Sequence, residues 1–127
     1  MTAPPRATDF DDWLARTFRR VGAFTMLIVL VEIGETSVAL LRASYLHVIG
    51  DETSWPEMAR LFADSGAAWN GAAFFQADRA GLISDALAKA RLGSLVRRLE
   101  EDRTLLNEGE FFNAQGFRLK LEEITAQ

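Results

Sequence analysis

The chain has 127 residues, of which 49% are hydrophobic and 25% are charged, and these fractions are typical of an ordinary globular protein. The absence of cysteine excludes thiol catalysis, disulfide bonds and cysteine-ligated zinc. The formal charge of −4 disfavours nucleic acid as a partner, because DNA-binding proteins normally present a net basic face.

The length predicts one domain after a short tail. Residues 1–8 contain Pro4 and Pro5 and are expected to form a disordered N-terminal tail. Residues 9–127 are expected to form a single globular domain, which is large enough to bury a core without a disulfide or a metal ion. A chain without cysteine is also compatible with the reducing cytoplasm, which is the location that we predict.

The first predicted helix begins at Thr8 or Asp9, either of which can cap it, and Asp11 and Asp12 suit its positive first turn. Three arginines near its end are interpreted as complements of the helix dipole that also aid solubility, with contact to an acidic partner as the alternative. These arginines are Arg16, Arg19 and Arg20. The residues that recur at helical spacing and predict the buried face are Phe10, Trp13, Leu14, Phe18 and Val21.

Residues 21–33 are the most apolar part of the chain, and the first eleven of them carry no charge. A membrane span needs about 20 apolar residues, whereas this run is interrupted by Glu32 and followed by Glu35. A secretory signal is disfavoured by the acidic residues upstream, where a basic segment is expected. We therefore predict a central strand that is covered on both faces, with a buried helix as the alternative.

The segments after this run are predicted to be helical. Residues 37–49 contain good helix formers and are predicted as a helix, while a strand that forms a hairpin with the apolar run is the alternative. A second helix follows Ser54, because Ser54 and Glu57 form a capping-box pattern, and Gly66 ends it. Its predicted inward residues are Met58, Leu61 and Phe62.

The C-terminal half predicts a strand, a long helix and a second strand. A short strand is expected after the Asn70–Gly71 turn, and a helix with a leucine stripe is expected from Asp85 to about Asn107. Residues 117–122 alternate apolar and charged side chains, which predicts a half-exposed strand at a sheet edge. These elements predict an α+β fold, in which helices pack on a small, partly parallel three-stranded sheet. A mostly α-helical fold with a C-terminal hairpin is the alternative.

The sequence contains no recognisable catalytic motif. The G-x-S-x-G, P-loop, G-x-G-x-x-G and H-E-x-x-H patterns are absent. The single histidine, His47, lies in an apolar segment and is interpreted as a structural or surface residue. We therefore predict no catalytic residue, no metal site and no cofactor.

Two groups of residues are candidates for binding. Glu32 and Glu35 follow the predicted central strand, at the kind of position where open α/β sheets bind ligands, and with His47 and Asp51 they would form a carboxylate and histidine cleft. Aromatic residues near turns are candidate partner anchors, because aromatic side chains dominate the centres of protein interfaces. This second group consists of Trp69 and Asn70 together with Phe111 and Phe112.

The favoured function is that of a small, acidic, non-catalytic protein that binds another protein or its own copy, as a regulatory, inhibitor or immunity-type module. The alternative is a small-ligand-binding protein or enzyme that uses the carboxylate and histidine cleft at the end of the central strand. A third hypothesis is a membrane-associated protein held by Arg19, Arg20 and the apolar run, but the shortness of that run disfavours it.

Overall fold

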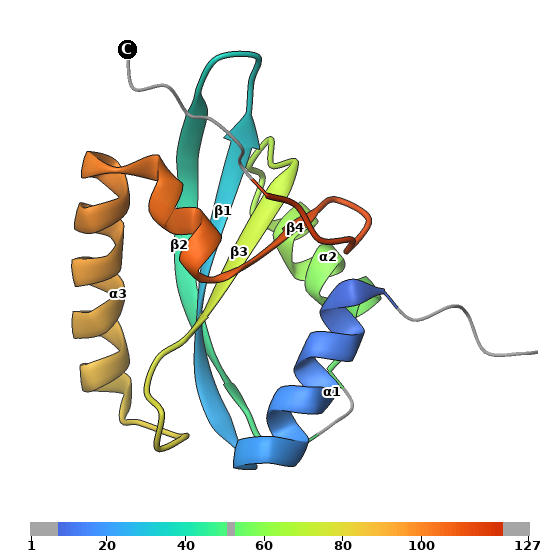
Figure 1. Cartoon of the computed structure of the whole chain (residues 1–127), viewed down its shortest axis with the longest axis vertical. Helices are drawn as coiled ribbons and strands as arrows, with labels where there is room; N and C mark the ends of the chain where they lie inside the picture. The colour runs from blue at the N-terminus through green and yellow to red at the C-terminus, as the bar shows by residue number, and fades with distance from the viewer. Residues whose placement is uncertain (1–7, 51–52, 121–127) are drawn as a thin grey trace, which may run out of the picture.

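The computed structural model describes residues 8–50 and 53–120, which form a four-stranded antiparallel sheet between two layers of helices (Figure 1). In chain order the elements are α1 (Asp9–Val21), β1 (Phe24–Ile33), β2 (Val38–Val48), α2 (Trp55–Asp64), β3 (Gly71–Gln76), α3 (Asp85–Glu101), the 3₁₀ helix η1 (Arg103–Glu108) and β4 (Glu110–Asn113). The strand order is β2-β1-β3-β4. Helices α1 and α2 cover one face of the sheet, and α3 and η1 cover the other.

The apolar run forms β1, the central buried strand, as predicted. The first eight of its ten residues are buried, because helices cover both faces of the sheet. Successive side chains point to opposite faces, so Met26 and Ile28 join the core under α1 and α2. Leu27 and Val29 join the core under α3. A strand with two covered faces favours apolar residues on both of them, which explains why the run shows no alternation.

The prediction of a helix at residues 37–49 was wrong, because this segment is β2. Gly34 N donates to Ser37 O at 2.8 Å and closes a tight turn after β1. β2 then pairs with β1 at ten positions, from Ile33 opposite Val38 to Phe24 opposite Val48. Helix propensity separates ordinary residues by at most about 0.7 kcal/mol each, and pairing along a buried strand outweighs this preference.

The predicted partly parallel, three-stranded sheet was also wrong. All neighbouring strands are antiparallel, because the hairpin turns β2 back along β1, and because β3 and β4 each run opposite to their neighbour. The last strand is β4 rather than residues 117–122; within the described part of that segment, a single bridge joins Arg118 to Phe112. The long helix ends at Glu101, and η1 continues the chain towards β4. Among the described residues, no helix is long and apolar enough to cross a membrane.

An aromatic cluster attaches α1 and α2 to the sheet. The ring of Phe10 lies 5.2 Å from that of Trp55 and 5.6 Å from that of Phe112, measured between centroids. The predicted cap of α1 is confirmed, since Thr8 Oγ1 accepts a hydrogen bond of 3.1 Å from Asp11 N. Asp11 Oδ1 also accepts a bond of 2.9 Å from Trp55 N, so one carboxylate links the beginnings of both helices.

Candidate functional site

The aromatic residues predicted as partner anchors belong to the interior. Phe111 and Phe112 are 1% and 0% exposed, and they point to opposite faces of the sheet because they are consecutive residues of β4. Trp69 is half-buried, and its ring lies 6.1 Å from that of Trp55 and 5.2 Å from that of Phe62. These side chains stabilise the fold and leave little surface for a partner.

Asn70 has a structural role at the beginning of β3. Its side-chain Oδ1 accepts a hydrogen bond of 2.6 Å from Ile33 N, and its Nδ2 donates one of 3.1 Å to Ile33 O. The amide therefore replaces a neighbouring strand for the last residue of β1. Both ends of its side-chain amide therefore bind the backbone of Ile33.

The predicted carboxylate and histidine cleft does not form. Glu32 lies opposite Ala39 near the turn of the hairpin, whereas His47 lies opposite Thr25 at the other end of β1. Glu32 lies seven positions after Thr25 along the strand, which corresponds to roughly 23 Å. Glu35 is an exposed residue near the turn, beside Glu32 rather than His47. Asp51 lies outside the described residues. The sequence interpretation failed because it treated residues 37–49 as a helix, whereas they form β2, which carries His47 to the end of β1 far from Glu32.

His47 instead joins a hydrogen-bonded chain of three side chains. Its Nδ1 lies 2.8 Å from Thr25 Oγ1, and its Nε2 lies 2.7 Å from Asp85 Oδ1 in the first turn of α3. Ile83 N also donates to Thr25 Oγ1, at 3.1 Å. This cluster therefore connects β1, β2 and the beginning of α3.

The ionisable groups of this cluster are influenced by Asp85. The hydrogen bond from His47 lowers the pKa of Asp85 below its usual value, and a hydrogen bond from Tyr45 acts in the same direction. Partial desolvation raises the pKa of Tyr45, and the negative charge of Asp85 adds to this increase. The cluster thus favours an ionised carboxylate beside a neutral phenol.

The cluster resembles a catalytic triad only in the order of its groups. A hydroxyl, an imidazole and a carboxylate follow one another, but Thr25 is 0% exposed and its oxygen already accepts the bond from Ile83 N. A nucleophile must reach its substrate, and this hydroxyl has no path to one. We interpret Thr25, His47 and Asp85 as a structural link between the hairpin and α3.

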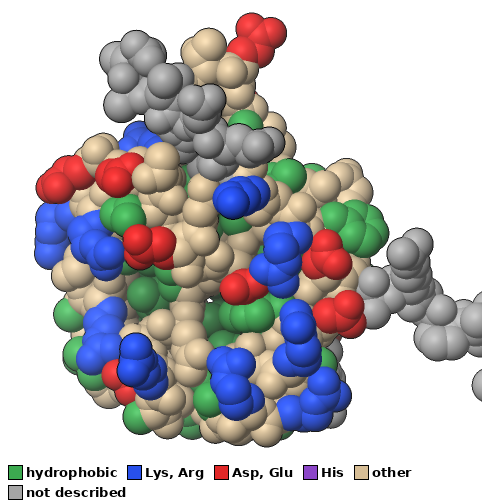
Figure 2. All heavy atoms as spheres, viewed as in Figure 1, with side chains coloured by type: hydrophobic (Ala, Val, Ile, Leu, Met, Phe, Trp, Pro, Cys, Tyr) green, Lys and Arg blue, Asp and Glu red, His purple; other side chains and the backbone are tan. Residues whose placement is uncertain are grey.

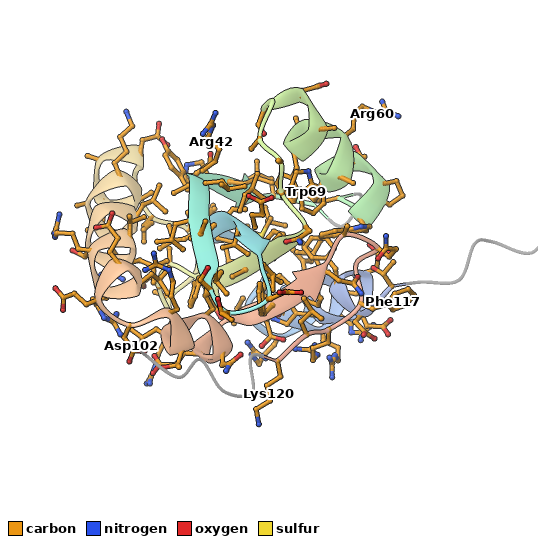
Figure 3. All side chains as sticks on the ribbon, turned by 90° about the horizontal axis from the view of Figure 1, so that it is seen from above. Arg42, Arg60, Trp69, Asp102, Phe117 and Lys120 are labelled. Atoms are coloured by element: carbon orange, nitrogen blue, oxygen red, sulfur yellow. The ribbon has the colours of Figure 1, made fainter. Side chains whose placement is uncertain are left out.

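An apolar cavity lies beside β2. Within the described residues β2 pairs only with β1, so its outer edge carries no neighbouring strand. Figure 3 shows Arg42 on this outer side of β2, between α3 and α2. A cavity of about 380 Å³ opens between β2 and α2. It is lined by Ile28, Leu30, Arg42, Ala43, Ser44, Tyr45, Leu46, Met58, Leu61, Phe62 and Ser65.

Leu61 was predicted to face inward, and this prediction was wrong. Its side chain is 57% exposed on α2 and lines this cavity, whereas Met58 and Phe62 are buried as predicted. α2 lies across only part of the sheet face, and the β2 side of that face remains accessible beside it. The signal that could have found this site was the hairpin alternative for residues 37–49, which the sequence analysis named but did not favour.

No family model, curated protein or solved structure matches this chain significantly. Within residues 8–50 and 53–120, no group of three or more histidine or acidic side chains is arranged to hold a metal ion. The function is therefore inferred from the geometry of this one chain, and the β2 edge with its cavity is the candidate site.

Proposed function

We propose that this protein binds an extended segment of a partner protein, which adds as a fifth strand to the free edge of β2 and inserts an apolar side chain beside α2. The observation that supports this proposal is an eleven-residue edge strand next to an apolar cavity of about 380 Å³. Strand addition gains affinity from main-chain hydrogen bonds, and pockets for alternate side chains provide specificity.

The direction of the backbone groups supports strand addition. Ala77 N donates to Thr25 O at 2.8 Å on the β3 side of β1. Backbone N–H and C=O groups alternate between the two edges of a strand. Those of Thr25 therefore point away from β2, and those of His47, its opposite residue, point to the outer edge of β2. The same alternation directs the N–H and C=O groups of Ala43 and Tyr45 to the free edge.

The edge lacks most of the features that prevent pairing. Natural edge strands usually carry lysine, proline or inward-pointing charges. Within β2, Arg42 is the only charged residue besides the titratable His47, and Ala43 and Ser44 are small and exposed. The protective features are the charge of Arg42 and a shift of register between Leu30 and Val31 of β1. The edge beyond this shift is therefore open to another strand.

The cavity indicates what kind of segment would bind. Its walls are mainly aliphatic and aromatic, so it suits a leucine, methionine or phenylalanine side chain of the partner. Arg42 lines the same cavity and would favour an acidic residue nearby in the partner segment. A second copy of this chain, pairing β2 with β2, is the other occupant that the experiment must distinguish.

The test combines peptide selection with matched leucine variants. Extended peptides would be selected from a displayed random library against the wild-type protein, and their affinities would be measured by fluorescence polarisation. Leu61→Glu should weaken the selected peptides at least tenfold, since it removes an apolar contact and introduces a charge that must be desolvated. Leu87→Glu is the control, because Leu87 is also an exposed helical leucine, on α3 at 40% exposure.

Amide hydrogen exchange gives a second readout, in which bound peptide should protect the amides of Ala43 and Tyr45. Peptides that bind Leu61→Glu as tightly as wild type would contradict the proposal, and so would a selection without enrichment. Light scattering that finds a wild-type dimer, dissociated by Leu61→Glu alone, would identify a second copy as the occupant.

A further inference from the structure

A second accessible region lies towards the other edge of the sheet, where β4 leaves part of β3 unpaired. β4 pairs with β3 from Gly71 to Phe74 only, so Phe75 and Gln76 lie beyond its end. Two adjoining cavities of about 600 and 400 Å³ share these two residues. Figure 2 shows this hollow near the middle of the face, between α3 and α1, with Lys and Arg side chains on several sides of it. We call the larger cavity, between α1 and β4, the arginine cavity.

Arginines from distant parts of the chain surround this hollow. Arg16 and Arg20 of α1 and Arg118 line the arginine cavity, while Arg91 and Arg98 of α3 line the smaller one. This concentration of positive charge contrasts with the formal charge of −4 for the whole chain. A local basic cavity on an acidic protein attracts anions to that position rather than to the surface in general.

The carboxylates in the arginine cavity are already paired with arginines. Glu110 forms an ion pair with Arg118, and Glu108 lies 3.8 Å from Arg98. Arg16 donates Nε to the backbone oxygen of Asp12, and Arg20 makes no ion pair with any described residue. Two guanidinium groups on one face of α1 therefore remain available for an anion.

Thr17 provides an independent sign that the arginine cavity receives a polar ligand. It lies on α1 between Arg16 and Arg20, lines the same cavity and is 1% exposed. Its Oγ1 is the buried side-chain atom that lacks a hydrogen-bond partner among the described residues. Buried polar groups nearly always have a partner. Because this oxygen has almost no accessible surface, a ligand in the cavity would supply one once the side chain rotates towards it.

We infer that the arginine cavity binds a small organic phosphate. Arg16 and Arg20 hold the phosphate group of this ligand, and the apolar part of the ligand lies beside Trp13 and Phe75. Guanidinium groups match the geometry of phosphate oxygens through paired hydrogen bonds. Trp13, Phe75 and the Gln76 amide also line the cavity, so a ligand with a ring or chain attached to its phosphate makes more contacts than phosphate alone. A volume of about 600 Å³ is within the usual range for small-molecule sites.

This site is separate from the proposed strand-addition site. The β2 edge and the arginine cavity lie towards opposite edges of the sheet, whose strand order is β2-β1-β3-β4. Variants at Leu61 leave the arginines unchanged, and variants at Arg20 leave the β2 edge unchanged. The two inferences can therefore fail independently.

The test uses phenyl phosphate as the probe, titrated into labelled protein and followed by NMR. The indole N–H of Trp13 and the side-chain amide of Gln76 should show saturable shifts. Phenol, which lacks the phosphate, and inorganic phosphate, which lacks the ring, should each bind at least tenfold more weakly. Such comparisons separate the contribution of charge from that of the apolar body.

Two arginine variants distinguish this cavity from general electrostatic attraction. Arg20→Gln should weaken phenyl phosphate at least tenfold, whereas Arg60→Gln, on the exposed side of α2, should change affinity less than twofold. Thr17→Val removes the hydroxyl without changing the shape of the side chain. It should weaken binding severalfold while circular dichroism remains unchanged.

Several outcomes would overturn the inference. The absence of saturable shifts at about 10 mM phenyl phosphate would exclude a specific site, and equal losses in Arg20→Gln and Arg60→Gln would indicate diffuse attraction. Equal affinity for inorganic and phenyl phosphate would refute the role of Trp13 and Phe75. A single-stranded oligonucleotide that binds more tightly than phenyl phosphate and shifts the same resonances would replace the small ligand with a macromolecular one.

Discussion

Replacing Phe112 with alanine tests whether the aromatic cluster stabilises the fold, as the structure requires, or serves a partner, as the sequence suggested. Phe112 is 0% exposed, and its ring lies 5.6 Å from that of Phe10, 6.2 Å from that of Trp55 and 5.8 Å from that of Phe74. Arg118 also lies over this ring, with 5.4 Å between its Cζ and the ring centroid. The substitution would remove the ring from the centre of these contacts.

The expected loss is large compared with the stability of a domain of this size. Truncating a buried phenylalanine to alanine costs about 3–5 kcal/mol, which includes the cavity that remains. The whole free energy of unfolding is typically about 5–15 kcal/mol. Since 1 kcal/mol shifts the Tm of such a domain by roughly 3–6 °C, we expect Phe112→Ala to lower the Tm by at least about 10 °C.

Thermal and urea unfolding, followed by circular dichroism, would measure this loss. Phe117→Ala is the matched control, because Phe117 lies in the same C-terminal part of the chain but is 42% exposed. It should cost less than about 2 kcal/mol, since less apolar surface returns to water. A Phe112→Ala variant that is no less stable than Phe117→Ala would refute the assignment of Phe112 to the core.

Two further predictions concern a glycine pair and a titrating carboxylate. A β-carbon on Gly109 would lie 2.7 Å from both Phe74 O and the ring of Phe75; Gly109→Ala should therefore destabilise the protein by about 1–3 kcal/mol. Gly93→Ala inside α3 meets nothing closer than 3.7 Å and should stabilise it by up to about 1 kcal/mol in urea unfolding; the reverse order would contradict this steric reasoning. Folding lowers the pKa of Asp85, chiefly through the His47 hydrogen bond. The ionised carboxylate therefore stabilises the fold at pH values above its unfolded pKa of about 3.8, and this contribution disappears as the pH falls through the lower pKa of the folded state. The Tm difference between wild type and Asp85→Asn should accordingly shrink below pH of about 4, and a difference that stays constant with pH would show that the charge is not involved.

Local sequence signals predicted some elements well. α1 carries its own cap at Thr8, and β1 is recognisable because a strand buried on both faces is almost entirely apolar, with Thr25 as its one buried polar residue. β2 was misread because its composition suits a helix when the chain is considered alone. Its conformation is decided by pairing with β1, and that contact is visible only when the turn at Gly34 is recognised as a hairpin.

The candidate sites were harder to predict, because they depend on contacts between distant residues. His47 reaches Asp85, 38 positions away, rather than the nearby glutamates. The exposure of Leu61 depends on how far α2 extends over the sheet, which helical spacing does not specify. The arginine cavity combines residues from positions 13 to 118, and each of its arginines considered alone resembles an ordinary surface cation.

The contact between the beginning and the end of the described chain has a consequence for folding during synthesis. Phe10 N donates to Gly116 O at 3.1 Å, and Arg118 N donates to Asp9 Oδ2 at 2.7 Å across 109 positions. Phe10 therefore lacks its contacts with Phe112 and Gly116 until the ribosome has made β4 and the turn that follows it. The nascent chain must keep this part of the aromatic surface from aggregating until β4 has emerged, and only then can the two ends of the described chain join.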